Sequence, residues 1–178
     1  MRSNIAAAAF LILCIFVFGF MLNSCAGADY ADRFSYTAHD FEAKIQGQID
    51  GNEVSVILRS RRSENEGNTV TLTYKSPDAL DGIVLSQTAS GEYEARLGEL
   101  VLQDFNAEGL LKPFLPFLYS GEIASARKDG EGHTVISVKS GENDLEYVFS
   151  EKSEYPHSVK GRVGERYIEL FVETLEFI

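Results

Sequence analysis

The chain has 178 residues and carries 27 acidic against 16 basic side chains, which gives a formal net charge of −11. An acidic surface of this kind repels phosphate backbones, so nucleic acid is excluded as an expected partner. The chain has only two cysteines, and Cys14 lies inside an apolar N-terminal run. We therefore expect neither a disulfide framework nor a cysteine metal site.

The N-terminus has the layout of a secretory signal. Arg2 supplies a positive start, and the run from Ile5 to Leu22 contains no charged residue. A run of about 18 apolar residues also reaches the lower limit for a membrane-spanning helix. A cleaved signal and an uncleaved signal anchor therefore both fit this segment.

The residues that end this run resemble the lipobox of bacterial lipoproteins. The match consists of Leu22, Asn23, Ser24 and Cys25 followed by the small residue Ala26, and Asn23 is its least usual member. The resemblance implies that the chain is cut before Cys25 and that its thiol carries a diacylglycerol, with palmitate among the acyl groups. Several acyl chains, each gaining about 0.8 kcal/mol per buried methylene, hold a protein stably at a membrane.

This resemblance predicts a lipoprotein signal peptide over residues 1–24, a lipidated tether over 25–33 and one domain over 34–178. An uncleaved anchor and a plain secreted protein are the alternatives. Loss of Arg2 with the signal changes the formal net charge to −12, so an anionic bilayer repels the domain. We expect it on the outer face of the cytoplasmic membrane, or on the outer membrane of a cell that has one.

The pattern of apolar residues predicts β-strands over most of the domain. Apolar residues alternate over 34–36, 41–49, 54–58, 70–74, 83–87, 93–97 and 100–102, and again over 123–128, 133–139, 145–149, 158–163 and 167–177. Asp50-Gly51 between two alternating runs is a strong hairpin signal. In the last strand Glu173 interrupts the phase between Phe171 and Leu175, which predicts that both faces of this strand are covered.

One segment, Asn106 to Tyr119, predicts helix. Its apolar residues fall on nearly every side, as in a buried helix, and they are Leu110, Leu111, Phe114, Leu115, Phe117 and Leu118. Pro113 and Pro116 cannot sit in the middle of a straight helix without loss of hydrogen bonds. We expect two short helical turns, with Pro113 near the first position of the second turn.

These elements predict a mainly β fold. Eight to ten strands, mostly joined by hairpins, form a sheet large enough to curl, and the apolar helical segment is available to cover its concave face. The predicted architecture is a curled antiparallel meander sheet, an open half-barrel, with one short helical insertion on the concave side.

Parts of the chain resemble the LolA/LolB-like lipoprotein family. The strand Val70 to Ser76, followed by Pro77, Leu80 and Gly82, is similar to a strand and P-x-x-L-x-G motif of small LolA-like lipoproteins. Glu92 to Leu102, Leu110 to Leu118 and Tyr155-Pro156 resemble the strand pair, helical cover and closing proline that follow. The resemblance implies a hollow that takes lipid acyl chains. The arginine that closes LolA and the projecting leucine of LolB have no match, so the fold transfers more safely than the transport activity.

The sequence carries no nucleotide, serine-hydrolase or metal-ligand motif, and we expect no enzyme activity, no cofactor and no metal. We expect the histidines to be solvated or hydrogen-bonded rather than catalytic, and they are His39, His133 and His157. We expect an acidic cluster to form a solvated strand edge rather than a calcium site, and it consists of Glu165, Glu169, Glu173 and Glu176. Two functions stay open: binding of a lipid or other apolar ligand at the concave face, and docking of an envelope protein by a domain with a filled core. The apolar set from Leu110 to Leu118 serves as a lid in the first and as core filling in the second, and we favour core filling.

Overall fold

The computed structural model describes residues 28–178 except 64–66, 89, 103–104 and 119–120. The expected lipobox, Leu22 to Cys25, lies outside the described residues, as does the apolar run before it. Within the described residues, no helix is both long and apolar enough to cross a membrane.

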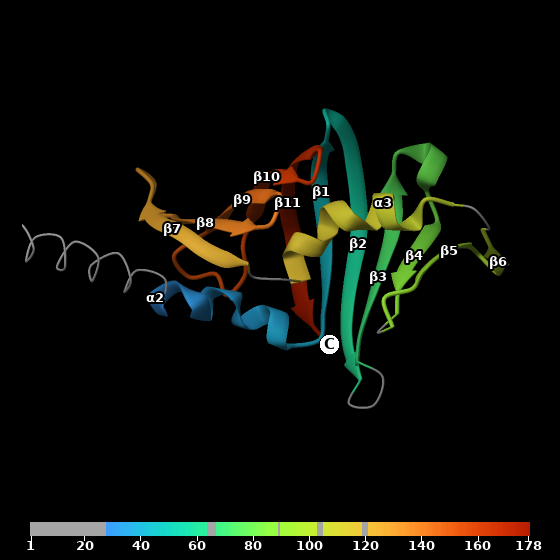
Figure 1. Ribbon diagram of the computed structural model, residues 1–178, viewed down its shortest axis with the longest axis horizontal. Helices are drawn as coiled ribbons and strands as arrows, with labels where there is room; N and C mark the ends of the chain where they lie inside the picture. Colours follow the sequence, from blue (N-terminus) through green and yellow to red (C-terminus); the bar gives the residue numbers. More distant parts are fainter. Residues whose placement is uncertain (1–27, 64–66, 89, 103–104, 119–120) are drawn as a thin grey trace, which may run out of the picture.

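One antiparallel sheet of eleven strands dominates the described chain (Figure 1). The strands are β1 (Phe41–Ile49), β2 (Asn52–Ser63), β3 (Gly67–Ser76), β4 (Ile83–Gln87), β5 (Tyr93–Leu97), β6 (Leu100–Val101), β7 (Glu122–Lys128), β8 (Thr134–Ser140), β9 (Asn143–Phe149), β10 (Ser158–Val163) and β11 (Arg166–Phe177). Their order is β6-β5-β4-β3-β2-β1-β11-β10-β9-β8-β7. The sheet is curled and does not close, since β6 and β7 stay at opposite edges, and the predicted mainly β class is confirmed.

The first and last strands join the two halves of the sheet. Strands β1 to β6 form one run of neighbours and β7 to β11 another, and β1 pairs with β11 from Phe41 opposite Phe177 to Ile49 opposite Ile168. The hairpin predicted at Asp50-Gly51 is confirmed. Both residues have positive φ, 52° and 78°, as a type I′ turn between two strands requires.

A bulge in β11 explains the broken phase of the last strand. Lys44 lies opposite Thr174 while Ile45 lies opposite Val172, so Glu173 has no direct partner in β1. The expectation of cover on both faces is wrong, because Phe171 on the outer face is 42% exposed. The acidic residues of β11 also do not mark a sheet edge, since this strand lies in the middle of the sheet.

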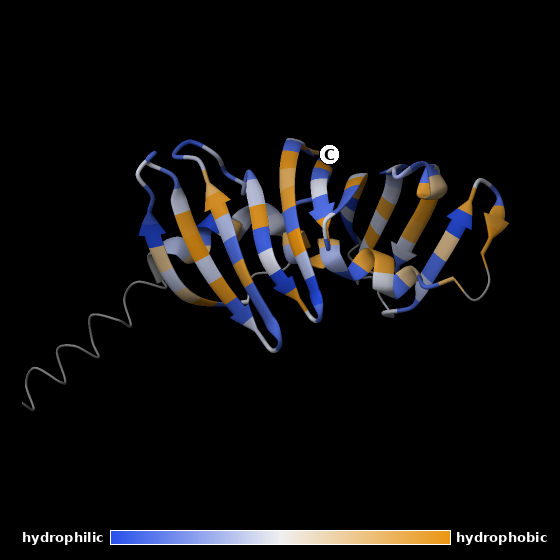
Figure 2. Ribbon diagram, turned by 90° about the horizontal axis from the view of Figure 1, so that it is seen from above, coloured by the Kyte–Doolittle hydropathy of each residue, from blue (hydrophilic) through white to orange (hydrophobic). Residues whose placement is uncertain are grey.

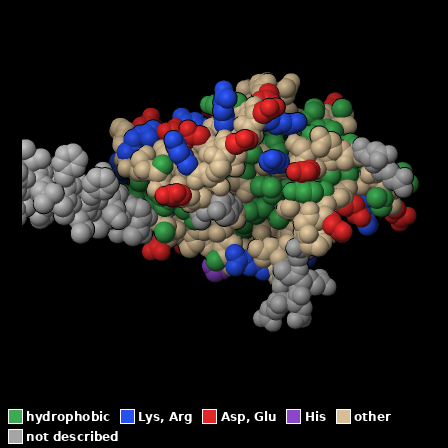
Figure 3. Space-filling model, viewed as in Figure 1, with side chains coloured by type: hydrophobic (Ala, Val, Ile, Leu, Met, Phe, Trp, Pro, Cys, Tyr) green, Lys and Arg blue, Asp and Glu red, His purple; other side chains and the backbone are tan. Residues whose placement is uncertain are grey.

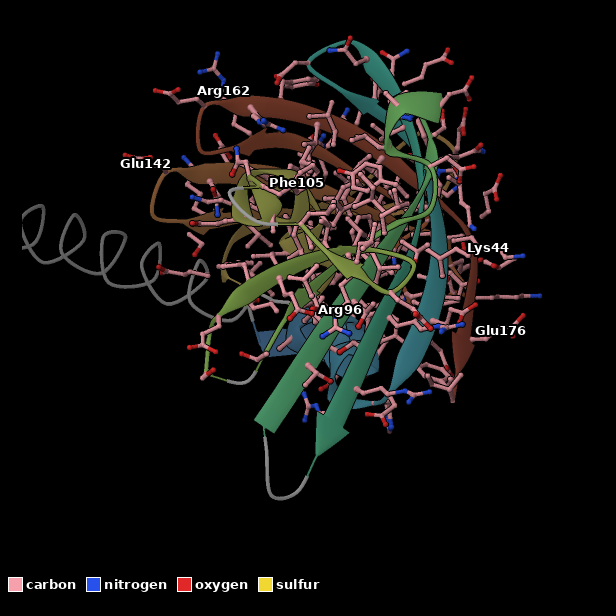
Figure 4. The ribbon with its side chains drawn as sticks, turned by 90° about the vertical axis from the view of Figure 1, so that its right-hand side faces the viewer. Lys44, Arg96, Phe105, Glu142, Arg162 and Glu176 are labelled. Carbon is pink, nitrogen blue, oxygen red and sulfur yellow. The ribbon has the colours of Figure 1, made fainter. Side chains whose placement is uncertain are left out.

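The two faces of the sheet differ in polarity. Apolar and polar segments alternate along the strands (Figure 2), and the inward rows of β1, β2 and β3 are almost fully buried. Lys44 and Glu176 point away from the packed side chains, whereas Phe105 lies toward them (Figure 4). The core therefore lies on the concave side, where the helical segments pack.

Two helical segments cover the concave side. The first joins α2 (Ala28–Ala31) to η1 (Asp32–Ala38), and the second joins α3 (Ala107–Leu111) to η3 (Lys112–Leu118), while η2 (Asp78–Leu80) is a single turn between β3 and β4. The second segment confirms the two short turns expected from its prolines. Pro113 is the second residue of η3 and Pro116 lies within it, where tight 3₁₀ geometry takes the place of a straight α-helix.

The strand predicted at residues 34–36 is wrong, because this stretch is the 3₁₀-helix η1. Phe34 and Tyr36 are both buried, with the Phe34 ring 5.0 Å from that of Tyr147 and the Tyr36 ring 5.9 Å from that of Phe41. Two apolar residues two positions apart are too few to separate strand from helix. The part of the expected tether that is described, from Ala28 on, is helical, and Arg33 donates a hydrogen bond to the Ser153 carbonyl over 3.0 Å.

Candidate functional site

The six apolar residues predicted as core or lid form two sets. Leu111, Phe114 and Phe117 are fully buried, and the ring of Phe114 lies 6.2 Å from that of Tyr74 in an edge-to-face arrangement. Leu110, Leu115 and Leu118 are half-buried and pack against the margin of the core. One set therefore fills the core, and the other leaves apolar surface at the edge of the helical cover.

Two tyrosines on the floor of the sheet hold the helical cover. The Tyr74 hydroxyl of β3 donates to the Leu110 carbonyl, and the Tyr147 hydroxyl of β9 donates to the Pro116 carbonyl, each over 3.0 Å. Pro113, three residues after Leu110, has no N–H to offer that carbonyl in a 3₁₀ turn, so the tyrosine supplies a donor from the sheet. Pro113 therefore leaves free the Leu110 carbonyl that Tyr74 holds, and Tyr147 holds the carbonyl of Pro116.

Burial also shifts the ionisation of these tyrosines. Burial raises the pKa of Tyr74 to about 12, and the positive charge of Arg166 acts in the opposite direction. Burial raises the pKa of Tyr147 further, and the Tyr36 hydroxyl, which has no hydrogen-bond partner among the described residues, has its pKa raised by burial and by Tyr147. All three side chains are neutral at physiological pH.

A hollow of about 240 Å³, which we call the apolar slot, remains between η3 and strands β8 to β10. Its lining is mainly apolar and consists of Lys112, Leu115, Pro116, Gly121, Val138, Ser140, Asn143, Leu145, Tyr147 and Val163. The inward side chains of β8, β9 and β10 form its floor, and η3 forms its roof. Apolar clefts with a few polar groups are the usual form of small-molecule sites.

A second cavity of about 220 Å³, which we call the adjoining pocket, lies next to the slot. It is lined by Gly109, Lys112, Pro113, Val163, Gly164, Glu165 and Arg166. Lys112 and Val163 line both cavities, so the two are neighbours along one side of η3. Figure 3 shows this face of the molecule, where hydrophobic side chains are exposed between basic and acidic ones.

A larger and more polar groove of about 470 Å³ lies where β1, β2 and β11 meet. It is lined by Gln46, Gly47, Gln48, Glu53, Val54, Ser55, Ser76, Glu169 and Phe171. Most of these side chains belong to the outer, solvent-facing rows of the strands. Its size exceeds that of the slot, but its polar lining does not suit an apolar ligand.

The histidines take structural positions. The rings of His133 and His157 lie 5.3 Å apart, and His133 Nδ1 lies 3.0 Å from Asp129 Oδ2. Burial acts to raise the pKa of Asp129, but the hydrogen bonds it accepts from His133 and Glu131 lower it overall. His39 stacks edge-on against Phe177 at 5.4 Å. Over the described ranges, no three His, Cys, Asp or Glu side chains are grouped so as to hold a metal ion.

The sequence predicted the helical roof of the slot but neither the strand residues that form its floor nor the basic residues of the adjoining pocket. Leu115 is the one member of the predicted apolar set that lines the slot. Val138, Leu145 and Val163 were expected only as strand residues, and nothing in their spacing shows that a hollow lies beside them. Lys112 and Arg166 are 54 positions apart in the sequence and line the same cavity only because η3 lies over β10, which leads into β11.

Comparison with known proteins shows the fold alone. No protein-family model matches the chain, and no curated protein matches it in sequence. An uncharacterized conserved protein from Thermus thermophilus is similar in structure, with a TM-score of 0.52 and 13% identity over 85% of this chain and 86% of that one. MucB is similar with a TM-score of 0.51 and 10% identity over 85% of this chain, which spans 58% of the MucB chain. A domain named for outer membrane lipoprotein sorting, from Vibrio parahaemolyticus, has a TM-score of 0.43 and 12% identity over 85% and 92% of the two chains.

Proposed function

We propose that this protein is a non-catalytic envelope lipoprotein that binds one alkyl chain in the apolar slot. The observation that carries the proposal is the slot itself, a mainly apolar hollow between a helical roof and a sheet floor. The resemblance of parts of the sequence to the LolA/LolB-like family supports the same ligand class.

The size of the slot limits the ligand. Typical drug-sized sites measure roughly 300–1,000 Å³, and the slot alone holds about 240 Å³. Most of the concave side is occupied by buried side chains such as Phe114 and Phe117. A single chain fits this space, whereas a bundle of acyl chains would require the cover to move away from the sheet.

Export and anchoring form the second part of the proposal. The lipobox-like residues Leu22 to Cys25 support a thioether-linked diacylglycerol on Cys25. The test is metabolic labelling with a palmitate analogue followed by mass spectrometry of the mature N-terminus. We expect label on the wild-type chain and none on Cys25→Ala, and label that persists in Cys25→Ala would refute the anchor.

Filling the slot tests the ligand. All eleven strands and both helical segments lie within residues 28–178, so a signal-less chain from Ala26 retains the complete core. Leu115→Trp places a bulky ring in the slot, and Leu118→Trp, at a half-buried site of the same helix outside the slot lining, is the matched control. The chain has no tryptophan of its own, so the fluorescence of each variant reports where the new ring lies.

The readout is native mass spectrometry of protein incubated with a bacterial membrane extract. We expect one bound lipid on the wild type and on Leu118→Trp, and at least tenfold less on Leu115→Trp. A wild-type protein that retains no lipid, or equal lipid on both variants, would refute binding in the slot.

Docking of an envelope protein is a second candidate, favoured by the free edge of the sheet at β6. Leu97, Leu100 and Val101 are all exposed there, with Leu100 at 68%. An exposed apolar edge strand is a template for pairing with another chain. Crosslinking from position 101 in cells tests this function, and a discrete protein adduct that Leu100→Lys abolishes is the expected result.

A further inference from the structure

The adjoining pocket holds two basic side chains without anionic partners. Lys112 begins η3 and Arg166 begins β11, and both line the pocket. Among the described residues, neither side chain makes an ion pair or a hydrogen bond, whereas Arg59, Arg127 and Lys160 all pair with glutamates. Glu165 also lines the pocket, but it lies within 4.0 Å of neither cation, so it leaves both charges available.

Arg166 does not simply extend into water. The residue is half-buried, and its charge acts on the buried Tyr74 hydroxyl beneath the helical cover. A guanidinium that lines the pocket offers several N–H donors to a group bound there. In a chain with a formal net charge of −11, two unpaired cations at one pocket make a local site for an anion.

The cation pair lies beside the apolar slot, in the pocket that shares part of its lining. Lys112 and Val163 border both cavities, so the adjoining pocket is the neighbouring space for the terminal group of a chain that fills the slot. The pocket's volume of about 220 Å³ is several times the roughly 30 Å³ that one water occupies in the liquid. That is enough room for a carboxylate or a phosphate with part of its hydration.

We propose that the ligand of the slot is an amphiphile with one alkyl chain and an anionic head group, and that Lys112 and Arg166 bind this head group. The inference rests on the proposed function and adds the head-group chemistry to it. Arg166 matches a carboxylate or phosphate by two parallel hydrogen bonds, and Lys112 adds a flexible point charge at the shared border. A neutral or cationic head group leaves these cations unpaired, so the site discriminates by charge.

Four ligands of equal chain length test the charge preference. Dodecanoate, dodecyl phosphate, dodecanol and dodecylammonium are titrated, below their micelle concentrations, into the signal-less chain and followed by calorimetry. We expect the two anions to bind about tenfold or more tightly than dodecanol, with dodecylammonium weakest. The relative affinities of dodecanoate and dodecyl phosphate show whether a fatty acid or a phospholipid is the better model, and inorganic phosphate alone tests for an anion site that needs no chain.

Charge reversal tests the two residues. Lys112→Glu and Arg166→Glu are both expected to abolish the preference for dodecanoate over dodecanol, and Arg166→Glu, which lies outside the slot lining, should also retain dodecanol binding. Lys44→Glu and Arg162→Glu, on exposed side chains outside both cavities, are the matched controls and should keep the preference. Raising the salt concentration should reduce the difference in affinity between dodecanoate and dodecanol for the wild-type protein, because salt screens the charge of the cations.

The outcomes separate the two proposals. If none of the four ligands binds, the proposed function fails. If all four bind alike, or if Lys112→Glu and Arg166→Glu behave as the controls do, the alkyl site stands and the anionic head group is refuted. If inorganic phosphate binds as tightly as dodecyl phosphate, the site recognises a free anion and the amphiphile is refuted.

Discussion

Replacing Gly47 with alanine should weaken the junction between the two halves of the sheet. Gly47 lies in β1 opposite Leu170 of β11 and has a φ of +151°. A Cβ built on it would lie 2.1 Å from the Glu169 carbonyl oxygen and 2.9 Å from the Leu170 Cα. Both atoms belong to the backbone of the neighbouring strand, so no side-chain rotation can relieve the overlap.

The expected cost has two parts. The positive φ costs an L-residue about 1–3 kcal/mol, and forced overpacking adds about 1–3 kcal/mol. We expect Gly47→Ala to lose about 2–6 kcal/mol, a large share of the ~5–15 kcal/mol that stabilises a typical domain. Gly161→Ala should behave in the same way, because its Cβ would lie 2.1 Å from the Asp144 carbonyl oxygen.

Substitutions at two other glycines separate the cost of a positive φ from the cost of overpacking. Gly51 has a φ of +78° with nothing within 4 Å of its Cβ position, so Gly51→Ala measures backbone strain alone, about 1–2 kcal/mol. Gly130 has open space and no positive φ, so Gly130→Ala should change stability by less than about 0.5 kcal/mol. The assay is urea unfolding of the signal-less chain, followed by circular dichroism. The reasoning is refuted if Gly47→Ala costs no more than Gly51→Ala.

Three further substitutions examine the helical cover and the outer face. Phe114→Ala should lower the free energy of unfolding by about 3–5 kcal/mol, measured in urea, because the ring is fully buried against Tyr74. A loss below about 1 kcal/mol would show that the helical cover is not part of the core. The raised pKa of Tyr74 implies that its contribution to the free energy of unfolding is complete below pH 10 and falls as the pH rises to about 12. Melting temperatures measured across this pH range should therefore fall less steeply for Tyr74→Phe than for the wild type. An equally steep fall in both proteins would contradict the burial of the Tyr74 hydroxyl. A hydrogen bond from Arg127 lowers the pKa of Glu146, so the stabilising effect of this carboxylate is present at neutral pH and is lost as the pH falls below 4.5. Glu146→Gln should therefore cost roughly 0.2–1 kcal/mol in urea unfolding at pH 7, and this cost should shrink as the pH falls below 4.5.

The candidate site was only partly accessible to sequence reasoning. Leu115 was found because an all-round apolar segment must be buried or covered, and Leu115 does line the slot. Arg166 could not be found, because a single arginine after a turn is ordinary in sequence. The proposed role of Arg166 in binding an anion depends on the cavity that it lines and on the absence of an ion-pair partner among the described residues.

The local sequence alone, through alternating apolar residues and the Asp50-Gly51 turn, determined most of the strands of this protein and its first hairpin. A period of two residues and the left-handed conformation of a type I′ turn depend only on near neighbours. Residues 34–36 were too short for that period to be decisive, and packing of Phe34 against Tyr147 stabilises helix there instead. Tertiary structure decided the pairing of β1 with β11, the bulge at Glu173 and the slot beneath η3. Each of these depends on segments far apart in the chain, and no local preference specifies which distant strand or helix will lie beside them.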